Sequence, residues 1–213
     1  MRKLLCSALI FAVVLVAVTS LAGAVYVSIS EEITVDGDLS DWANATILSW
    51  SSPYSKTEVN LFYILHSENS YFIGARIYDI DSVGDDSMDI YLNNTADTYR
   101  FELEEGEDSF NAYKLVNGTW NPVSVNASVV YTKSKVQNPY SYLEMSIPKE
   151  LMNNSTTLLF YAEHTSPLPK SVYSKYPEAG DANNISTWEV LKFFAPGERA
   201  LNLTILDREG VPA

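Results

Sequence analysis

The feature that most constrains the fold is a succession of short segments in which apolar and aromatic residues recur at every second position. From Val59 to Leu65, every second side chain is apolar or aromatic, so these side chains share one face of an extended strand. Several segments carry such residues on both faces, which is typical of strands buried between two packed layers. The segments with this pattern are 59–66, 71–79, 88–92, 99–103, 113–116, 123–131, 140–147, 157–164 and 188–194.

The connections between these segments indicate antiparallel pairing. Asn117-Gly118, which separates two alternating segments, is a dipeptide preferred in two-residue hairpin turns. The helical signal is limited to one turn at 148–152, which begins at a proline. This pattern predicts an all-β fold, an antiparallel β-sandwich with jelly-roll or immunoglobulin-like layers and almost no helix, rather than an α/β fold.

The amino terminus has the pattern of a secretory signal peptide. Arg2 and Lys3 precede an apolar run, and Ala22-Gly23-Ala24 matches a cleavage site. The alternative is an uncleaved membrane anchor, because apolar character extends from residue 4 to 27. We predict a signal peptide at 1–24, a sandwich domain at 25–195, and at 196–213 a C-terminal strand or the stub of a following immunoglobulin-like module. The protein is then secreted or displayed on the cell surface, and further domains of a longer protein are among its expected partners.

Charge and cysteine content narrow the chemistry. The chain has 27 acidic and 14 basic residues and a formal charge of −13, which argues against nucleic acid as a partner because phosphate binding depends on Lys and Arg. Without Arg2 and Lys3 the balance is 12 basic against 27 acidic residues, or −15. The single cysteine, Cys6, lies in the signal segment, so we expect no disulfide and no thiol chemistry.

N-x-S/T triplets are frequent, as in a surface-exposed glycoprotein. A chain rich in Asn, Ser and Thr also produces some of these triplets by chance. We predict that several are acceptors where the host has the machinery; the triplets begin at Asn44, Asn93, Asn117, Asn126, Asn153, Asn154, Asn184 and Asn202.

The segment Ile33–Ala45, with Asp36-Gly37 followed by Asp41-Trp42, resembles the opening of family 9 carbohydrate-binding modules and their DOMON-like relatives. The similarity continues in order over about residues 32–195, which strengthens it beyond a single motif. It implies a β-sandwich whose relatives bind sugars, haem or no known ligand, so function does not follow from the fold alone. The further matching segments are the paired strands at 59–66 and 70–80, the acidic loop at 79–86, the strand at 88–92 and the Glu-x-x-Ile-Pro end of 142–148.

Two aspartate-rich segments are candidate calcium sites, because calcium takes six to eight oxygen ligands. The first contains Asp36, Asp38 and Asp41, and the second contains Asp79 and Asp81, followed by Asp85 and Asp86. The resemblance implies structural calcium, and we take Asp36, Asp38, Asp79 and Asp81 as candidate ligands. The alternative is that Asp36-Gly37 forms a turn and that the acidic loops are merely solvated. No other cofactor is expected.

Sugar binding requires an aromatic face beside polar groups. The chain has 14 Tyr, 8 Phe and 4 Trp, but most of these should be buried in strands. Trp42 is predicted to pack against the end of the sandwich. Aromatic residues near turns and in the long segment 166–181 are the better candidates for sugar binding, and these are Trp50, Trp120, Tyr173 and Tyr176.

Catalytic motifs are absent: the sequence has no G-x-S-x-G, no H-E-x-x-H and no glycine-rich phosphate loop. The two histidines, His66 and His164, fall at strand ends, where a hydrogen-bonded structural role is expected. The first hypothesis is therefore a secreted, noncatalytic carbohydrate-binding module that recognises a polysaccharide or cell-surface glycan, with a membrane partner only if the signal segment is uncleaved. The alternative is a structural cell-surface domain without a small ligand. A third, weaker hypothesis is a haem-binding redox module with ligands drawn from Met88, Met145 and His164.

Overall fold

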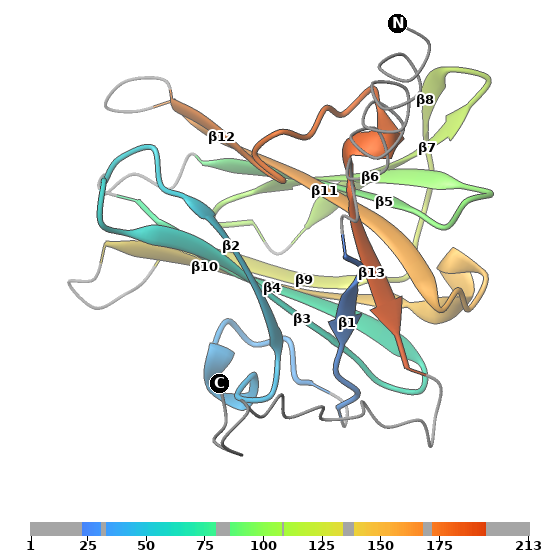
Figure 1. The fold of residues 1–213 in the computed structure, drawn as a ribbon, viewed down its shortest axis with the longest axis horizontal. Helices are drawn as coiled ribbons and strands as arrows, with labels where there is room; N and C mark the ends of the chain where they lie inside the picture. The colour runs from blue at the N-terminus through green and yellow to red at the C-terminus, as the bar shows by residue number, and fades with distance from the viewer. Residues whose placement is uncertain are drawn as a thin grey trace, which may run out of the picture.

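The computed structural model describes residues 23–30, 33–79, 86–107, 109–133, 139–167 and 172–194 as two packed β-sheets (Figure 1). The large sheet has the order β1-β13-β11-β5-β6-β7-β8, and β12 also pairs with β11. The small sheet has the order β2-β3-β4-β10-β9. Antiparallel pairing dominates both sheets, and β1 with β13 is a parallel pair. The fold is thus the all-β sandwich that the alternation predicts.

The strands have the following bounds. The large sheet contains β1 (Val25–Val27), β5 (Ser87–Asn93), β6 (Thr98–Glu104), β7 (Phe110–Val116), β8 (Thr119–Pro122), β11 (Thr157–Ser166), β12 (Val172–Tyr176) and β13 (Glu189–Phe193). The small sheet contains β2 (Thr46–Ser51), β3 (Val59–His66), β4 (Ser70–Tyr78), β9 (Ser128–Lys133) and β10 (Tyr140–Pro148). Three short 3-10 turns complete the described elements: η1 (Leu39–Asp41), η2 (Lys149–Met152) and η3 (Ile185–Thr187).

The core lies between the two sheets. Phe62 of β3, Phe101 of β6 and Phe160 of β11 are fully buried in one continuous apolar cluster. Phe62 and Phe160 meet edge to face, with ring centroids 5.0 Å apart, so they join the small and large sheets directly. Because side chains alternate along each strand, the residues between these positions point outward, which leaves a second face on each sheet.

Local sequence signals account for most of the boundaries. Asn117 and Gly118 both have positive φ and connect β7 to β8, as the hairpin signal predicts. The turn expected at 148–152 is η2. The expectation of one strand over 123–131 was wrong, because only the part from Ser128 onward is a strand. Within the part of the chain that the structure describes, no helix is long and apolar enough to span a membrane.

The Asp-Gly…Trp motif is attached to the small sheet by one buried carboxylate. Glu144 of β10 accepts hydrogen bonds from the backbone N–H groups of Asp36 and Gly37, each at 2.8 Å, and from Trp42 Nε1 at 3.1 Å. Gly37 has a φ of 86°, and a side chain at this position would also approach Val130. Trp42 is buried, as predicted, so the motif closes one side of the small sheet.

Candidate functional site

The outward face of the large sheet carries a separate aromatic cluster. Tyr91 of β5 and Tyr161 of β11 point away from the core, because their neighbours along each strand point into it. Trp188, just before β13, stacks on Tyr161 with ring centroids 5.8 Å apart and an interplanar angle of 16°. Trp120 of β8 meets the edge of Tyr91 at 5.9 Å. The result is an aromatic band that contains residues of β11, β5 and β8 and the residue that precedes β13.

Carboxylates lie directly beside this band. Glu163 of β11 accepts hydrogen bonds from the hydroxyl groups of Tyr161 and Tyr173, both at 2.6 Å. Asp89 lies opposite Glu163 on the neighbouring strand β5. Burial raises the pKa of Asp89, and the negative charge of Glu163 raises it further, while Arg100 opposes this shift.

Arg100 of β6 provides a cation on the same face. It forms an ion pair with Glu102, and its guanidinium carbon lies 5.0 Å from the ring centroid of Tyr113 and 5.7 Å from that of Trp120. Its Nε is buried and has no hydrogen-bond partner among the described residues. The Arg100 side chain is 23% exposed, so it places a positive charge beside aromatic rings at the surface of this face.

A loop between β12 and β13 borders the aromatic band. Trp188 Nε1 donates to the carbonyl oxygen of Asp181 at 2.8 Å, which holds this loop over the sheet. Gly180 lies so close to Tyr161 that a Cβ would come within 2.7 Å of the tyrosine ring. The loop therefore fixes one border of the face, and the hairpin of β7 and β8 forms the opposite border.

The four aromatic residues predicted to bind sugar are distributed over two places. Trp120 lies in the aromatic band and is partly buried, and Tyr173 is 53% exposed at its border. Tyr176 is partly buried and packs against core rings. The expectation that Trp50 lies in a loop without a core role was wrong: it belongs to β2, is 4% exposed and stacks on Phe62 at 4.4 Å.

Trp50 and Tyr173 nevertheless line one small cleft. It has a volume of about 240 Å³ and lies between the end of β2 and the strand β12. Trp50 Nε1 donates to the hydroxyl oxygen of Ser174 at 3.3 Å, and Glu178 accepts from the backbone N–H of Ser51. The cleft thus lies next to Tyr173 at the border of the aromatic band. The indole ring of Trp50, however, is buried in the core.

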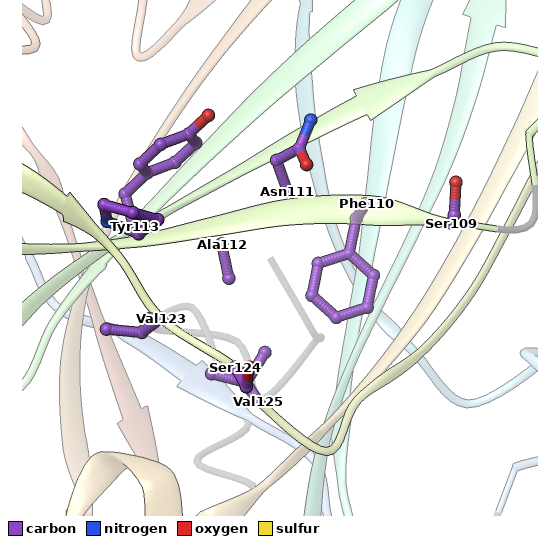
Figure 2. A pocket seen from close by; sticks show the side chains of 9 residues that line it. Ser109, Phe110, Asn111, Ala112, Tyr113, Val123, Ser124 and Val125 are labelled. Carbon is purple, nitrogen blue, oxygen red and sulfur yellow. The ribbon is translucent and has the colours of Figure 1, made fainter.

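A larger cavity of about 450 Å³ lies beside β7. Figure 2 shows Phe110 pointing from β7 toward the segment that contains Val125, whereas Asn111 and Tyr113 point to the other side. The lining has no charged side chain, and it combines apolar residues such as Phe110 and Val125 with the polar residues Ser109 and Ser124.

The predicted calcium ligands are also separated in space. Asp36 and Asp38 are exposed, and their side chains accept local backbone hydrogen bonds from Asp38 and Ser40, each at 3.0 Å. This is the turn that the alternative interpretation described. Asp81 lies outside the described residues. Asp79 is fully buried between the sheets, in a group that the sequence segments did not reveal.

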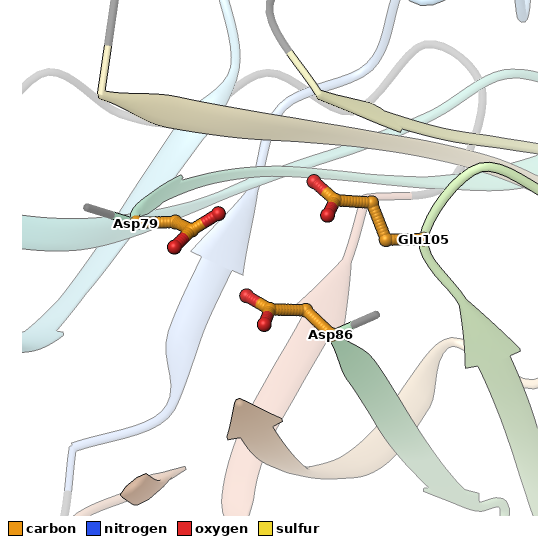
Figure 3. A group of neighbouring side chains, drawn as sticks. All are labelled: Asp79, Asp86 and Glu105. Carbon is orange, nitrogen blue, oxygen red and sulfur yellow. The ribbon is translucent and has the colours of Figure 1, made fainter. Parts of the chain in front are cut away.

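That group joins three carboxylates from three strand ends. Asp79 follows β4, Asp86 precedes β5 and Glu105 follows β6, and one ligand oxygen from each lies within 4.8 Å of the others (Figure 3). Their exposed fractions are 0%, 0% and 4%. The Ser141 hydroxyl lies within hydrogen-bond distance of both Asp79 and Glu105, although it has one proton to donate.

Buried polar atoms at this group without a partner in the described structure include Asp86 Oδ1, the Tyr131 hydroxyl and His164 Nδ1. His164 Nε2 lies 2.9 Å from Asp86 Oδ2, but Asp86 Oδ1 accepts no hydrogen bond. The Tyr131 hydroxyl is likewise unpartnered. Burial, followed by the charges of Asp86 and Glu105, raises the pKa of Tyr131 well above its usual value, so the hydroxyl stays protonated. An all-oxygen, buried and under-satisfied donor set fits a hard divalent cation.

Comparison with known proteins bears on the fold. No protein-family profile and no curated protein matches the sequence. Among solved structures, a family 9 carbohydrate-binding module from Caldicellulosiruptor kristjanssonii in complex with glucose is similar, with 17% identity and a TM-score of 0.52. The match covers 85% of this chain and 100% of that chain. The fold is that of a family 9 carbohydrate-binding module.

In this family 9-like sandwich, several side chains of the outward face were not singled out from the sequence. Arg100, Glu163 and Asp89 occupy the alternate positions of strands that the sequence did predict. A signal was available, because a polar residue at every second position marks the face that does not enter the core. Nothing local, however, shows that these positions on separate strands are neighbours.

Most of the predicted glycosylation triplets lie at the surface of the sandwich. Asn93 differs because it is buried: its amide donates to Thr98 and its carbonyl oxygen accepts from the backbone of Thr95. Asn202 lies outside the described residues. The exposed asparagines are Asn44, Asn117, Asn126, Asn153, Asn154 and Asn184.

The residues considered for haem ligation have other contacts. Met88 and Met145 belong to the apolar core and are fully buried. His164 bonds to Asp86, and His66 lies at the end of β3, where Lys149 Nζ is 3.0 Å from its Nδ1. Both histidines thus have the hydrogen-bonded placement that the sequence suggested.

Proposed function

We propose that this protein is a noncatalytic carbohydrate-binding module and that it binds sugar on the outward face of the large sheet. The observation that carries the proposal is the juxtaposition of Trp120 and Tyr113 with the charged groups Arg100, Glu102 and Glu163 on one face. A pyranose has an apolar side that packs on an aromatic ring and hydroxyl groups that need donors and acceptors.

The arrangement assigns a role to each group. Trp120 supplies the ring for packing, and the partly exposed guanidinium group of Arg100 supplies charged donors. Glu102 and Glu163 accept hydrogen bonds from sugar hydroxyls, and Tyr173 extends the face toward the cleft beside β2. No group in this set acts as a nucleophile or a general acid in our proposal, so the module binds without turnover.

The glucose complex of the family 9 module with the same fold supports this class of ligand. The fold alone does not specify a ligand, so the proposal depends on the side chains of this chain. Tyr91, Tyr161 and Trp188 are buried, and they act as a rigid support for the residues that contact sugar.

The test is calorimetric titration of the purified protein with glucose, preceded by a glycan array. Trp120→Ala should weaken binding by about tenfold because it removes the packing surface. Arg100→Met should weaken it by about tenfold to a hundredfold because it removes charged donors but keeps the aliphatic stem. Tyr26→Ala, at an exposed tyrosine of β1 that lies outside this aromatic cluster, is the matched control and should bind normally.

Two results would overturn the proposal. One is a folded protein that retains no glycan on the array, which would favour a structural surface domain. The other is binding that survives both Trp120→Ala and Arg100→Met, which would place the sugar elsewhere on the sandwich. A melting curve for every variant distinguishes lost binding from lost folding.

We also propose that the domain functions outside the cell, as a secreted or surface-displayed glycoprotein. Support comes from the charged and apolar pattern of residues 1–24 and from six triplets whose asparagines are exposed. N-terminal sequencing of the mature protein tests this: a start near residue 25 supports cleavage, and a start at Met1 supports an anchor. Glycan mapping should find no modification at the buried Asn93.

A further inference from the structure

We propose that the sugar face of the large sheet selects amino sugars, because Glu102, Asp89 and Glu163 form a row of carboxylates that pairs with the protonated amine of a glucosamine unit. We call these three residues the acidic row. The same row repels the carboxylate of a uronic acid. This inference rests on the proposed sugar-binding function and adds to it the charge of the sugar that the face prefers.

The acidic row follows from the strand register. Glu102 of β6 lies directly opposite Asp89 of β5, and Asp89 lies directly opposite Glu163 of β11. Side chains paired in this way have Cβ atoms about 4.5–5.5 Å apart. Met88 and Ile90, on either side of Asp89 in β5, are buried in the core, so Asp89 points to the outward face. Three partly exposed acids therefore lie side by side on three neighbouring strands.

The central residue of the row has a carboxylate on each side. Like charges at directly opposed positions destabilise a sheet. Burial raises the pKa of Asp89, Arg100 lowers it, and the charge of Glu163 raises it again. A cation placed against the row relieves the repulsion between these acids, whereas an added anion increases it.

The two cations that border the row do not balance its charge. Arg100 of β6 forms an ion pair with Glu102 at one end. Lys175 of β12 lies opposite Glu163 in the register, but its Nζ donates to the carbonyl oxygen of Gly180 at 2.6 Å. Two cations against three carboxylates leave the row negative even when both are counted in full.

The surroundings of the row are also acidic. Glu102 lines a hollow of about 170 Å³ together with Glu104 and Glu107. The whole chain carries a formal charge of −13. A surface of one sign raises the local concentration of ligands of the opposite sign, so the approach and the final contact both favour a positively charged sugar over an anionic one.

The experiment compares three sugars that share one ring and differ in charge. Glucosamine, glucose and glucuronate are titrated calorimetrically into the full chain at low salt and about pH 6, where the amine is protonated. Glucosamine should bind about fivefold more tightly than glucose, and glucuronate about fivefold more weakly. Both differences should shrink in about 0.5 M salt, because salt screens partly exposed charges.

The outcomes separate this inference from the proposed function. Equal affinity for glucosamine and glucose, or tighter binding of glucuronate, would overturn the charge selection and leave the sugar site in place. Differences in affinity that persist unchanged at high salt would also overturn it, because contacts other than charge would then cause them. No binding of any of the three sugars would overturn both proposals.

One variant tests the row directly. Asp89→Asn removes the central charge at nearly constant size and should reduce the ratio of glucosamine affinity to glucose affinity by about threefold. Asp38→Asn, the same substitution at an exposed aspartate of another segment, is the matched control and should keep the ratio. A folded Asp89→Asn protein with an unchanged ratio would contradict the role of the row. A melting curve verifies folding, and the salt series on the parent protein gives the answer if Asp89→Asn does not fold.

Discussion

Two buried carboxylate sites lie in this sandwich, and they differ in how the surrounding protein hydrogen-bonds their oxygen atoms. Glu144 is fully buried, yet three N–H groups from the Asp36–Trp42 segment donate to its two oxygens. The group of Asp79, Asp86 and Glu105 is equally buried, but it gathers three carboxylates and leaves an oxygen of Asp86 unpartnered. The protein itself satisfies the first site, whereas the second requires a cation or shared protons.

The difference teaches how a carboxylate's environment sets its role. At Glu144, donors from a distant segment stabilise the charge, so the carboxylate functions as an attachment point for that segment. At the three-carboxylate group, repulsion between acids opposes folding until something neutralises it. Two buried glutamates, Glu144 and Glu105, therefore lie in different surroundings: the first has three N–H donors, and the second lies beside two other carboxylates.

Removing the Glu144 carboxylate should have the largest effect. Glu144→Ala leaves three donors without an acceptor, and the free energy of unfolding should fall by about 4 kcal/mol. Urea unfolding followed by tryptophan fluorescence measures the loss. Glu150→Ala, at an exposed glutamate just after β10, is the control and should change stability by less than about 0.5 kcal/mol. An equal effect of both changes would contradict the attachment role.

Lowering the pH should reduce the free energy of unfolding through a third buried group, His66. Burial, assisted by Lys149, lowers the pKa of His66 to about 4. The unfolded chain takes up this proton near pH 6.5 and the folded chain only near pH 4, so stability falls as the pH drops through this window, by up to about 3 kcal/mol.

Glu144 should not contribute to that acid loss. Burial raises the pKa of Glu144 despite its three donors. A raised carboxyl pKa adds stability at low pH and loses it as the pH rises, which is the opposite direction. Unfolding free energies measured from pH 7 to pH 4 should therefore fall less steeply in His66→Gln than in the parent protein. Parallel pH profiles would show that another group controls the acid response.

One identical substitution tests the two carboxylate sites directly. Glu144→Gln forces an amide N–H₂ toward donors and should cost about 1–2 kcal/mol. Glu105→Gln, in the presence of chelator, removes one of three repelling charges and keeps an oxygen for Ser141, so stability should rise by about 1 kcal/mol. Urea unfolding shows whether each variant gains or loses stability. A loss in both variants would contradict the proposed difference between the two carboxylate sites.

The sequence predicts the strands well and the sites poorly, and the reason is physical. Alternation along a strand is a local property, so the bounds of β3 and β10 and the Asn117-Gly118 turn follow from neighbouring residues. Which side chains meet across strands depends on register and packing. Trp50 shows the difficulty: a Ser-Ser-Pro sequence follows it, but its place on β2 directs the ring into the core.

The acidic segments show the same limit. Aspartates that are close in sequence, such as Asp36 and Asp38, are exposed, and each accepts a hydrogen bond from a nearby backbone N–H. The carboxylates that do gather come from positions 79, 86 and 105, at three strand ends that only the folded sheets bring together. A cluster of acids in sequence is thus a weak guide to a cluster of acids in space.

The smallest predicted effect concerns Asp38, which contrasts with both buried sites. Its side chain caps the short η1 turn by accepting from the Ser40 N–H, in an exposed position. Asp38→Ala should reduce the free energy of unfolding by about 0.5–1 kcal/mol, and Asp38→Asn should be nearly neutral because asparagine caps equally well. A loss of stability in Asp38→Asn as large as that in Asp38→Ala would contradict the capping role.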